Sequence, residues 1–160
     1  MIRRLLLATG LLVLSLSATA GTWGTGSFDN DDAADFLLDA TKQADVQQLR
    51  SALERATSEG FLEAPDGAYA IASAEMVAAA MGKPTAEASK NAEVGDWVVR
   101  VHPKVDPSLA AEAVRALDRV LGDESELRQV WAESEEYDAW RGGVIALRDR
   151  IAALGSRSPK

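Results

Sequence analysis

Carboxylates are the side chains in this sequence that could carry chemistry, because the other catalytic types are scarce. The chain has no cysteine and a single histidine, His102. Disulfide scaffolds, thiol catalysis and metal sites built from several Cys or His residues are therefore excluded. His102 precedes Pro103 in an expected loop, with no Ser or Asp at a catalytic spacing, so we interpret it as a surface residue.

Glu75 is the carboxylate of greatest interest, because it interrupts the almost wholly apolar segment 66–81. A buried carboxylate must be paired, hydrogen-bonded or neutralised. Glu75 could meet an arginine, or Asp31 and Asp35, and form a site. The alternatives are a structural ion pair, or a surface position on a partly exposed helix.

Two other acidic groups have simpler interpretations. The run Asp29–Asp32 begins like an EF-hand calcium loop, but positions 5, 6 and 12 counted from Asp29 are all alanine. We interpret it as a capped helix start. The second group consists of Glu133, Glu135, Glu136 and Asp138. It resembles the paired carboxylates of glycosidases, but neighbours on one helix do not face each other across a substrate. We therefore interpret this group as a solvated acidic face.

The elements that position these side chains are expected to be helices. The chain has 160 residues, of which 47% are hydrophobic, which is enough for one domain with its own core. Apolar residues recur at three and four positions, and the pattern predicts an all-α fold, a compact bundle of about six or seven short helices. The expected helices cover about 30–40, 46–59, 66–81, 107–121, 123–135 and 138–154.

Three segments depart from an amphipathic helix pattern. Segment 66–81 is apolar on all sides, which is typical of a helix at the centre of a bundle. Segment 85–93 is polar and is expected to be a loop, and 94–101 is expected to be a short strand or a helical turn. The four tryptophans could line a groove, but their spacing beside Leu and Val favours core positions.

An irregular glycine-rich arm, 21–27, precedes the first helix. Its glycines do not favour a helix, and Trp23 is its large apolar residue. We expect Trp23 and Phe28 to pack on the bundle, so that the arm holds the first helix and its acids against segment 66–81.

The first twenty residues have the features of a signal peptide. Arg3 and Arg4 precede an apolar stretch, 5–16, and Ala18 and Ala20 occupy the positions of an A-x-A cleavage site. Cleavage after Ala20 would leave a mature domain, 21–154, and a disordered tail, 155–160. We therefore expect export to the periplasm or the extracellular space, with no membrane insertion after cleavage.

The net charge of −8 becomes −10 when Arg3 and Arg4 are removed with the signal peptide. A protein of this charge repels phosphate backbones, so we expect no nucleic-acid partner. A basic protein partner is compatible with the charge.

Three blocks of sequence resemble a bacterial family known only as a domain of unknown function. They are a W-G-x-G-x-F-x-N-D-x-A-x-D opening at 23–35, an A-x-A-E-x-V block at 72–77 and an S-E-L-R-x-x-W-x-E-S block at 125–134. The resemblance covers most of 21–154 and implies a small, mostly helical domain, with no established activity, cofactor or catalytic residue. Many members of that family resemble cytosolic proteins that begin with Met before G-x-W-G, and the export signal departs from this pattern.

We expect this chain to work by binding another protein, and an immunity-like role against a basic effector is one form of that function. The alternative is a carboxylate-based or metal-dependent hydrolase that uses Asp31, Asp35 and Glu75. No catalytic, cofactor-binding or metal-binding residue is assigned, and no cofactor is expected. The candidate functional cluster consists of Trp23, Phe28, Asn30, Asp31, Asp35 and Glu75.

Overall fold

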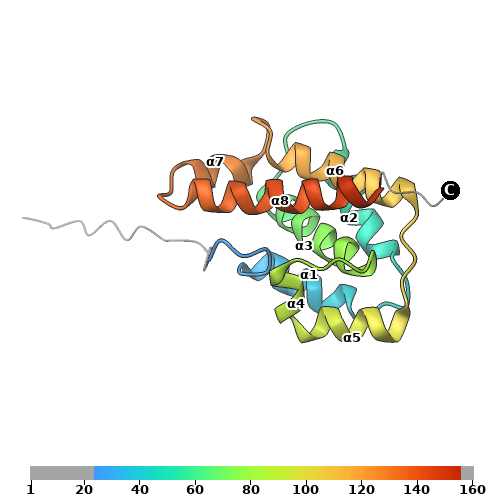
Figure 1. Ribbon diagram of the computed structural model, residues 1–160. Coiled ribbons are helices and arrows are strands. Elements are labelled where there is room, and N and C mark those ends of the chain that lie inside the picture. Colours follow the sequence, from blue (N-terminus) through green and yellow to red (C-terminus); the bar gives the residue numbers. More distant parts are fainter. Residues whose placement is uncertain (1–23, 156–160) are drawn as a thin grey trace, which may run out of the picture.

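The computed structural model describes residues 24–155, which form an all-α bundle preceded by an irregular arm (Figure 1). The bundle has eight helices in the described part of the chain, so the all-α prediction is confirmed. They are α1 (Asp31–Ala40), α2 (Gln47–Thr57), α3 (Ala64–Ala80), α4 (Ala86–Lys90), α5 (Ala92–Val101), α6 (Pro107–Val120), α7 (Glu126–Ala132) and α8 (Tyr137–Gly155).

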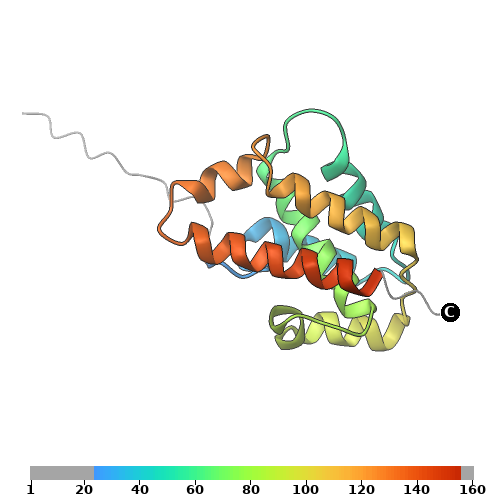
Figure 2. The same ribbon diagram turned by 45° about the horizontal axis from the view of Figure 1, so that its top comes forward.

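Helix α3 is the centre of the bundle, as its apolar sequence predicts. Every residue from Ala70 to Ala79 is buried, and α3 contacts each of the other helices. Figures 1 and 2 show α3 between α6 and α8 on one side and α5 on the other. The alanines of α3 are small, so neighbouring helices approach it closely on all sides. Gly82, with a φ of 76°, follows the end of α3, as expected for a helix C-terminus.

Local capping explains where several helices begin. The side chain of Asn30 accepts a hydrogen bond from the Ala33 N–H at the start of α1, as the acidic run predicts. Asp106 caps α6 in the same way, and Pro107 is the first residue of that helix. Helices α2 and α6 pack on α3 through the apolar stripes that their sequences predict.

Segment 85–101 differs from expectation, because it contains two helices instead of a loop and a short strand or turn. Thr85 Oγ1 accepts from the Ala88 N–H and starts α4, and Asn91 Oδ1 accepts from Glu93 and Val94 at the start of α5. Helix α4 buries Ala88 alone, so its sequence carries almost no apolar signal. Capping side chains therefore start both helices, and for α4 the cap acts where the hydrophobic pattern is weak.

Helix α7 begins at Glu126, later than the expected helix over about 123–135. Ser125 is the N-cap, and Glu126 Oε2 accepts a 2.7 Å hydrogen bond from the N–H of Ala64, the first residue of α3. Leu62 and Ser125 pair as an isolated parallel bridge, which brings the two helix starts together. Glu126 therefore caps a neighbouring helix, an arrangement that local sequence does not indicate.

Residues 1–23 and 156–160 lie outside the described range, so the predicted signal peptide, Trp23 and most of the expected tail are not described. Gly155, assigned to that tail, is the last residue of α8. None of the helices within 24–155 has the length and apolarity needed to cross a membrane.

Candidate functional site

A cleft of about 430 Å³ lies between the arm and the bundle. It combines a polar end, formed by the arm, Glu75 and the start of α4, with an apolar wall formed by α3, α7 and α8. The polar lining residues are Thr25, Ser27, Asp29, Asn30, Glu75, Thr85, Glu87 and Arg150. The main apolar lining residues are Ile71, Leu127, Trp131, Trp140, Val144 and Leu147.

Glu75 is buried at the polar end, with 2% of its surface exposed. Ser27 of the arm donates a 2.7 Å hydrogen bond to Glu75 Oε1, and Thr85 donates a 2.5 Å hydrogen bond to Oε2. Because Thr85 also caps α4, this carboxyl group joins the arm, the central helix and α4. The sequence left open an arginine, or Asp31 and Asp35, as partners of Glu75, but its hydrogen-bond partners are two hydroxyl groups.

Burial raises the pKa of Glu75 above its ordinary value of 4.5. The hydrogen bonds from Thr85 and Ser27 act in the opposite direction, because they stabilise the ionised form. The nearby charge of Glu87 raises the pKa further, and Arg150 lowers it. The cost of removing a carboxylate from water therefore outweighs the stabilisation by its partners.

The apolar wall is built around two tryptophans. Trp131 of α7 and Trp140 of α8 stack with ring centroids 5.8 Å apart and an interplanar angle of 10°. Both are buried, as is Trp97, so the prediction of core positions is confirmed for these three. Gly143 also lines the cleft, and a Cβ atom added there would meet no atom within 4 Å. A planar apolar group could lie against this wall.

The backbone of the arm lies close to the carboxylates of Asp29 and Glu87, which explains why two of its positions are glycine. A Cβ atom on Gly24 would lie 2.4 Å from Asp29 Oδ2, and one on Gly26 would lie 2.5 Å from the same oxygen and 2.9 Å from Glu87 Oε2. The Gly26 N–H donates to Asp29 Oδ2 at 3.1 Å. Glycine lets the backbone lie this close to Asp29 and Glu87, and a larger residue would displace these carboxylates.

The structure brings only part of the candidate cluster together. Asn30 and Glu75 both line the cleft, whereas Asp31 and Asp35 are exposed on α1 and do not line it. Phe28 is half-buried and packs against the core, in agreement with the docking predicted for it. Trp23 lies outside the described residues.

Sequence reasoning missed Ser27, Thr85, Glu87 and Arg150 at this cleft. Thr85 carried a usable signal, because a threonine after Gly82 and Pro84 is a candidate N-cap. The other three gave no signal, since they join Glu75 only through tertiary packing. Within residues 24–155, no three His, Cys, Asp or Glu side chains are grouped so that they could hold a metal ion.

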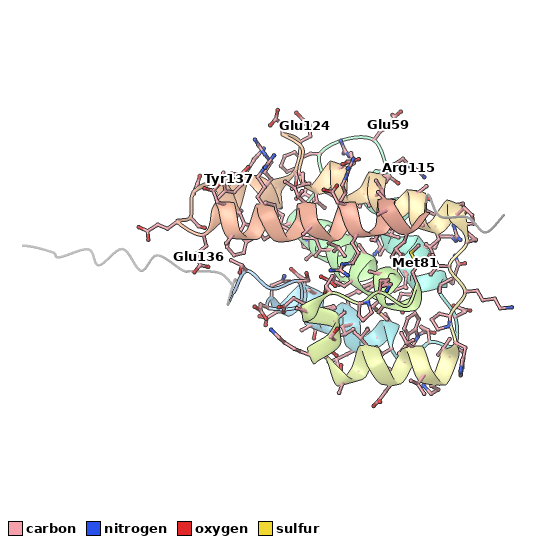
Figure 3. All side chains as sticks on the ribbon, viewed as in Figure 1. Glu59, Met81, Arg115, Glu124, Glu136 and Tyr137 are labelled. Atoms are coloured by element: carbon pink, nitrogen blue, oxygen red, sulfur yellow. The ribbon has the colours of Figure 1, made fainter. Side chains whose placement is uncertain are left out.

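A second feature is the surface around α7, which we call the acidic surface. Its five carboxylates are exposed, and none of them forms an ion pair among the described residues. They are Glu124, Glu133, Glu135, Glu136 and Asp138. Figure 3 shows Glu124 and Glu136 at the periphery of the molecule, Glu124 by the loop that precedes α7 and Glu136 where α7 leads into α8. The prediction of a solvated acidic face for this part of the sequence is confirmed.

Residues 21–143 match the family described as Domain of unknown function (DUF4259). No curated protein and no solved structure matches the chain. The match covers most of the sequence, so the chain belongs to this family of unknown function.

Proposed function

We propose that this family member is exported and works by binding a basic protein partner through the acidic surface around α7. Export is supported by Arg3 and Arg4, the apolar stretch 5–16 and the A-x-A site that ends at Ala20. The mature chain would then act in the periplasm or outside the cell. A basic effector that the protein neutralises is one form of such a partner.

The observation that carries this proposal is the concentration of exposed carboxylates without an ion pair in one short stretch, 124–138. Several other acids of the described chain form ion pairs within the protein, such as Asp106 with Arg50, Asp66 with Arg55 and Asp118 with Arg148. The five carboxylates around α7 have no such partner among residues 24–155. Surface charges left uncompensated in this way attract and orient a partner of opposite charge.

Apolar side chains exposed on α7 and beside its start support a protein partner. Val130 of α7 is 49% exposed, and Phe61, next to the Leu62–Ser125 bridge, is 46% exposed. A protein interface combines an apolar centre with a polar rim, and aromatic residues are enriched in it. Val130 and Phe61 could supply apolar contact area that carboxylates alone do not.

The placement of the other acids favours binding over the hydrolase alternative. That alternative needs Asp31, Asp35 and Glu75 to converge, but Asp31 and Asp35 are exposed on α1 whereas Glu75 is buried beneath the arm. This dispersal supports binding over a hydrolase that uses these three residues together.

The test is affinity capture from the cell envelope of the source organism with the mature chain, 21–160. The first variant changes Glu133, Glu135 and Glu136 to Gln. The control removes the same charge from an exposed set elsewhere, by changing Glu54 and Glu93 to Gln and Asp96 to Asn. We expect one basic protein to be captured by the wild type and by the control, and its capture by the first variant to fall at least tenfold.

Capture should also weaken as salt concentration rises, because exposed charges are screened. Equal capture by the two variants would place the partner elsewhere on the molecule. Capture that does not depend on salt would contradict an electrostatic interface.

A further inference from the structure

We propose that the cleft is the binding site for the chain's own processed N-terminus. In this arrangement the α-ammonium group of Gly21 pairs with the carboxylates at the polar end, and Trp23 packs against the wall formed by Trp131 and Trp140. The proposal rests on cleavage after Ala20, which is part of the proposed function. It does not involve the acidic surface or its partner, so the two can fail separately.

Connectivity puts the cleft within reach of residues 21–23. Gly24, the first described residue, is itself a lining residue. Residue 23 is therefore bonded to a residue at the edge of the cleft. Three residues can span at most about 11 Å. Asp29 and Glu87 lie against the arm at Gly24 and Gly26, well within that reach.

The charge of the cleft suits an ammonium group. Asp29, Glu75 and Glu87 contribute three carboxyl groups, whereas Arg150 is the one cationic side chain among its described lining residues. Arg150 Nη1 donates to the carbonyl oxygen of Pro84 at 3.4 Å and forms no ion pair with these acids. Glu87 has only a 3.6 Å contact with the exposed Lys90. An ammonium group has three donors and fits this set of acceptors.

The apolar wall suits the indole of Trp23. The wall presents the stacked Trp131 and Trp140, and aromatic side chains pack favourably on such pairs. The space in front of Gly143 is open in the described structure. A cleft of about 430 Å³ has room for one indole beside the three N-terminal residues.

The consequence is that processing completes the domain. In the precursor, the nitrogen of Gly21 is an uncharged amide bonded to Ala20, so it cannot form this ion pair. After cleavage the same nitrogen becomes an ammonium group at the cleft. The mature protein should therefore be more stable than any form that carries residues before Gly21.

The first experiment compares two purified proteins, the mature chain and a chain that begins at Thr19. Both are also made with Glu87→Gln. We expect the mature chain to melt several degrees higher than the extended chain, and Glu87→Gln to remove most of that difference. In NMR titration, the α-amine of the mature chain should have a pKa above the usual value of about 7.7–8.0, and Glu87→Gln should reduce that shift.

The second experiment uses two adjacent glycines of α8 as a matched pair. A Cβ atom added to Gly142 or to Gly143 would meet no atom within 4 Å, but only Gly143 lines the cleft. Gly142→Ala should raise the melting temperature because alanine favours the helix. Gly143→Ala should not raise it in the mature chain, since the new methyl group meets Trp23. In a Trp23→Ala background, both substitutions should be stabilising.

Three outcomes would overturn the proposal. The first is an α-amine with its ordinary pKa that does not respond to Glu87→Gln. The second is equal stabilisation by Gly142→Ala and Gly143→Ala in the mature chain. The third is native mass spectrometry that shows a small molecule bound to the mature chain, with the molecule lost in Gly143→Ala, which would make the cleft a ligand site.

Discussion

Glu75 is held by two hydroxyl groups from segments far apart in the chain, 48 and 10 residues from it in sequence. Its carboxyl group is the acceptor for both, so the arm and α4 depend on the same side chain. Removal of that acceptor would leave the hydroxyl of Ser27 without its partner and free the arm from α3. At the residue scale, Glu75 therefore has a structural role whatever the cleft binds.

Substitution of Glu75 by alanine should destabilise the fold. Glu75→Ala removes both hydrogen bonds and leaves a void beneath the arm, and large-to-small changes at buried positions cost about 2–5 kcal/mol. Chemical denaturation of the mature chain measures this loss. Glu54→Ala is the control, because Glu54 is exposed on α2, away from the cleft, and its loss should cost far less. Equal losses would contradict the structural role of Glu75.

The raised pKa of Glu75 predicts a pH dependence of stability. Burial favours the protonated form in the folded state, so this group binds its proton more tightly there than in the unfolded chain. Its favourable contribution is complete below the unfolded pKa, near 4.5, and is lost as the pH rises through the raised folded pKa. The free energy of unfolding should fall over this window in wild type relative to Glu75→Gln, which keeps the shape but does not titrate.

Glu87 and Arg150 face Glu75, and their titration would remain in Glu75→Gln. The difference between the two profiles therefore isolates Glu75 from them. Parallel pH profiles for the two proteins would contradict a raised pKa.

At the scale of elements, α4 is a five-residue helix that depends on its cap. A helix this short is not stable by itself, so the hydrogen bond from the Ala88 N–H to Thr85 Oγ1 and the packing of Ala88 keep it in place. The same hydroxyl donates to Glu75. One side chain therefore both starts α4 and joins it to the central helix.

Two substitutions of Thr85 separate hydroxyl chemistry from packing. Thr85→Val keeps the shape but removes the cap and the donor, and loss of an N-cap costs about 0.5–2 kcal/mol. Thr85→Ser keeps both and should remain close to wild type. Hydrogen exchange at the Ala88 amide should accelerate in Thr85→Val and not in Thr85→Ser. Similar exchange rates in the two variants would show that the hydroxyl does not hold α4.

At the scale of the whole molecule, charge and processing are linked. If the signal peptide is removed as proposed, loss of Arg3 and Arg4 changes the net charge from −8 to −10. The exported chain would thus be more acidic than its precursor. Its acidic surface around α7 lies on the bundle and is unchanged by cleavage.

Signal peptidase should cut after Ala20, because Ala18 and Ala20 are the small residues that it recognises. Mass spectrometry of the exported protein should give Gly21 as the first residue. A chain that retains Met1, or that stays attached to the membrane, would contradict this prediction and with it the proposal for the N-terminus. Capture of a basic partner by recombinant 21–160 could still succeed.

Much of the fold was predictable from local sequence. The apolar segment around Ala70–Ala79 predicted the central helix, because a helix without a polar face must be buried. Asn30 and Asp106 marked helix starts, because a cap acts on amides within three residues of it. Helix α4 was missed, since it buries one alanine and has little hydrophobic pattern.

The site was less predictable than the fold, and the reason is physical. The sequence by itself indicated that Glu75, whose neighbours along the helix are apolar, would need partners if it were buried, and it left an exposed position open. Only the tertiary structure decided that Ser27 and Thr85 are those partners, that Asp31 and Asp35 stay in solvent, and that Trp131 and Trp140 line a cleft. Helical periodicity determines which face of a helix is buried, whereas the packing of whole elements determines which side chains meet there.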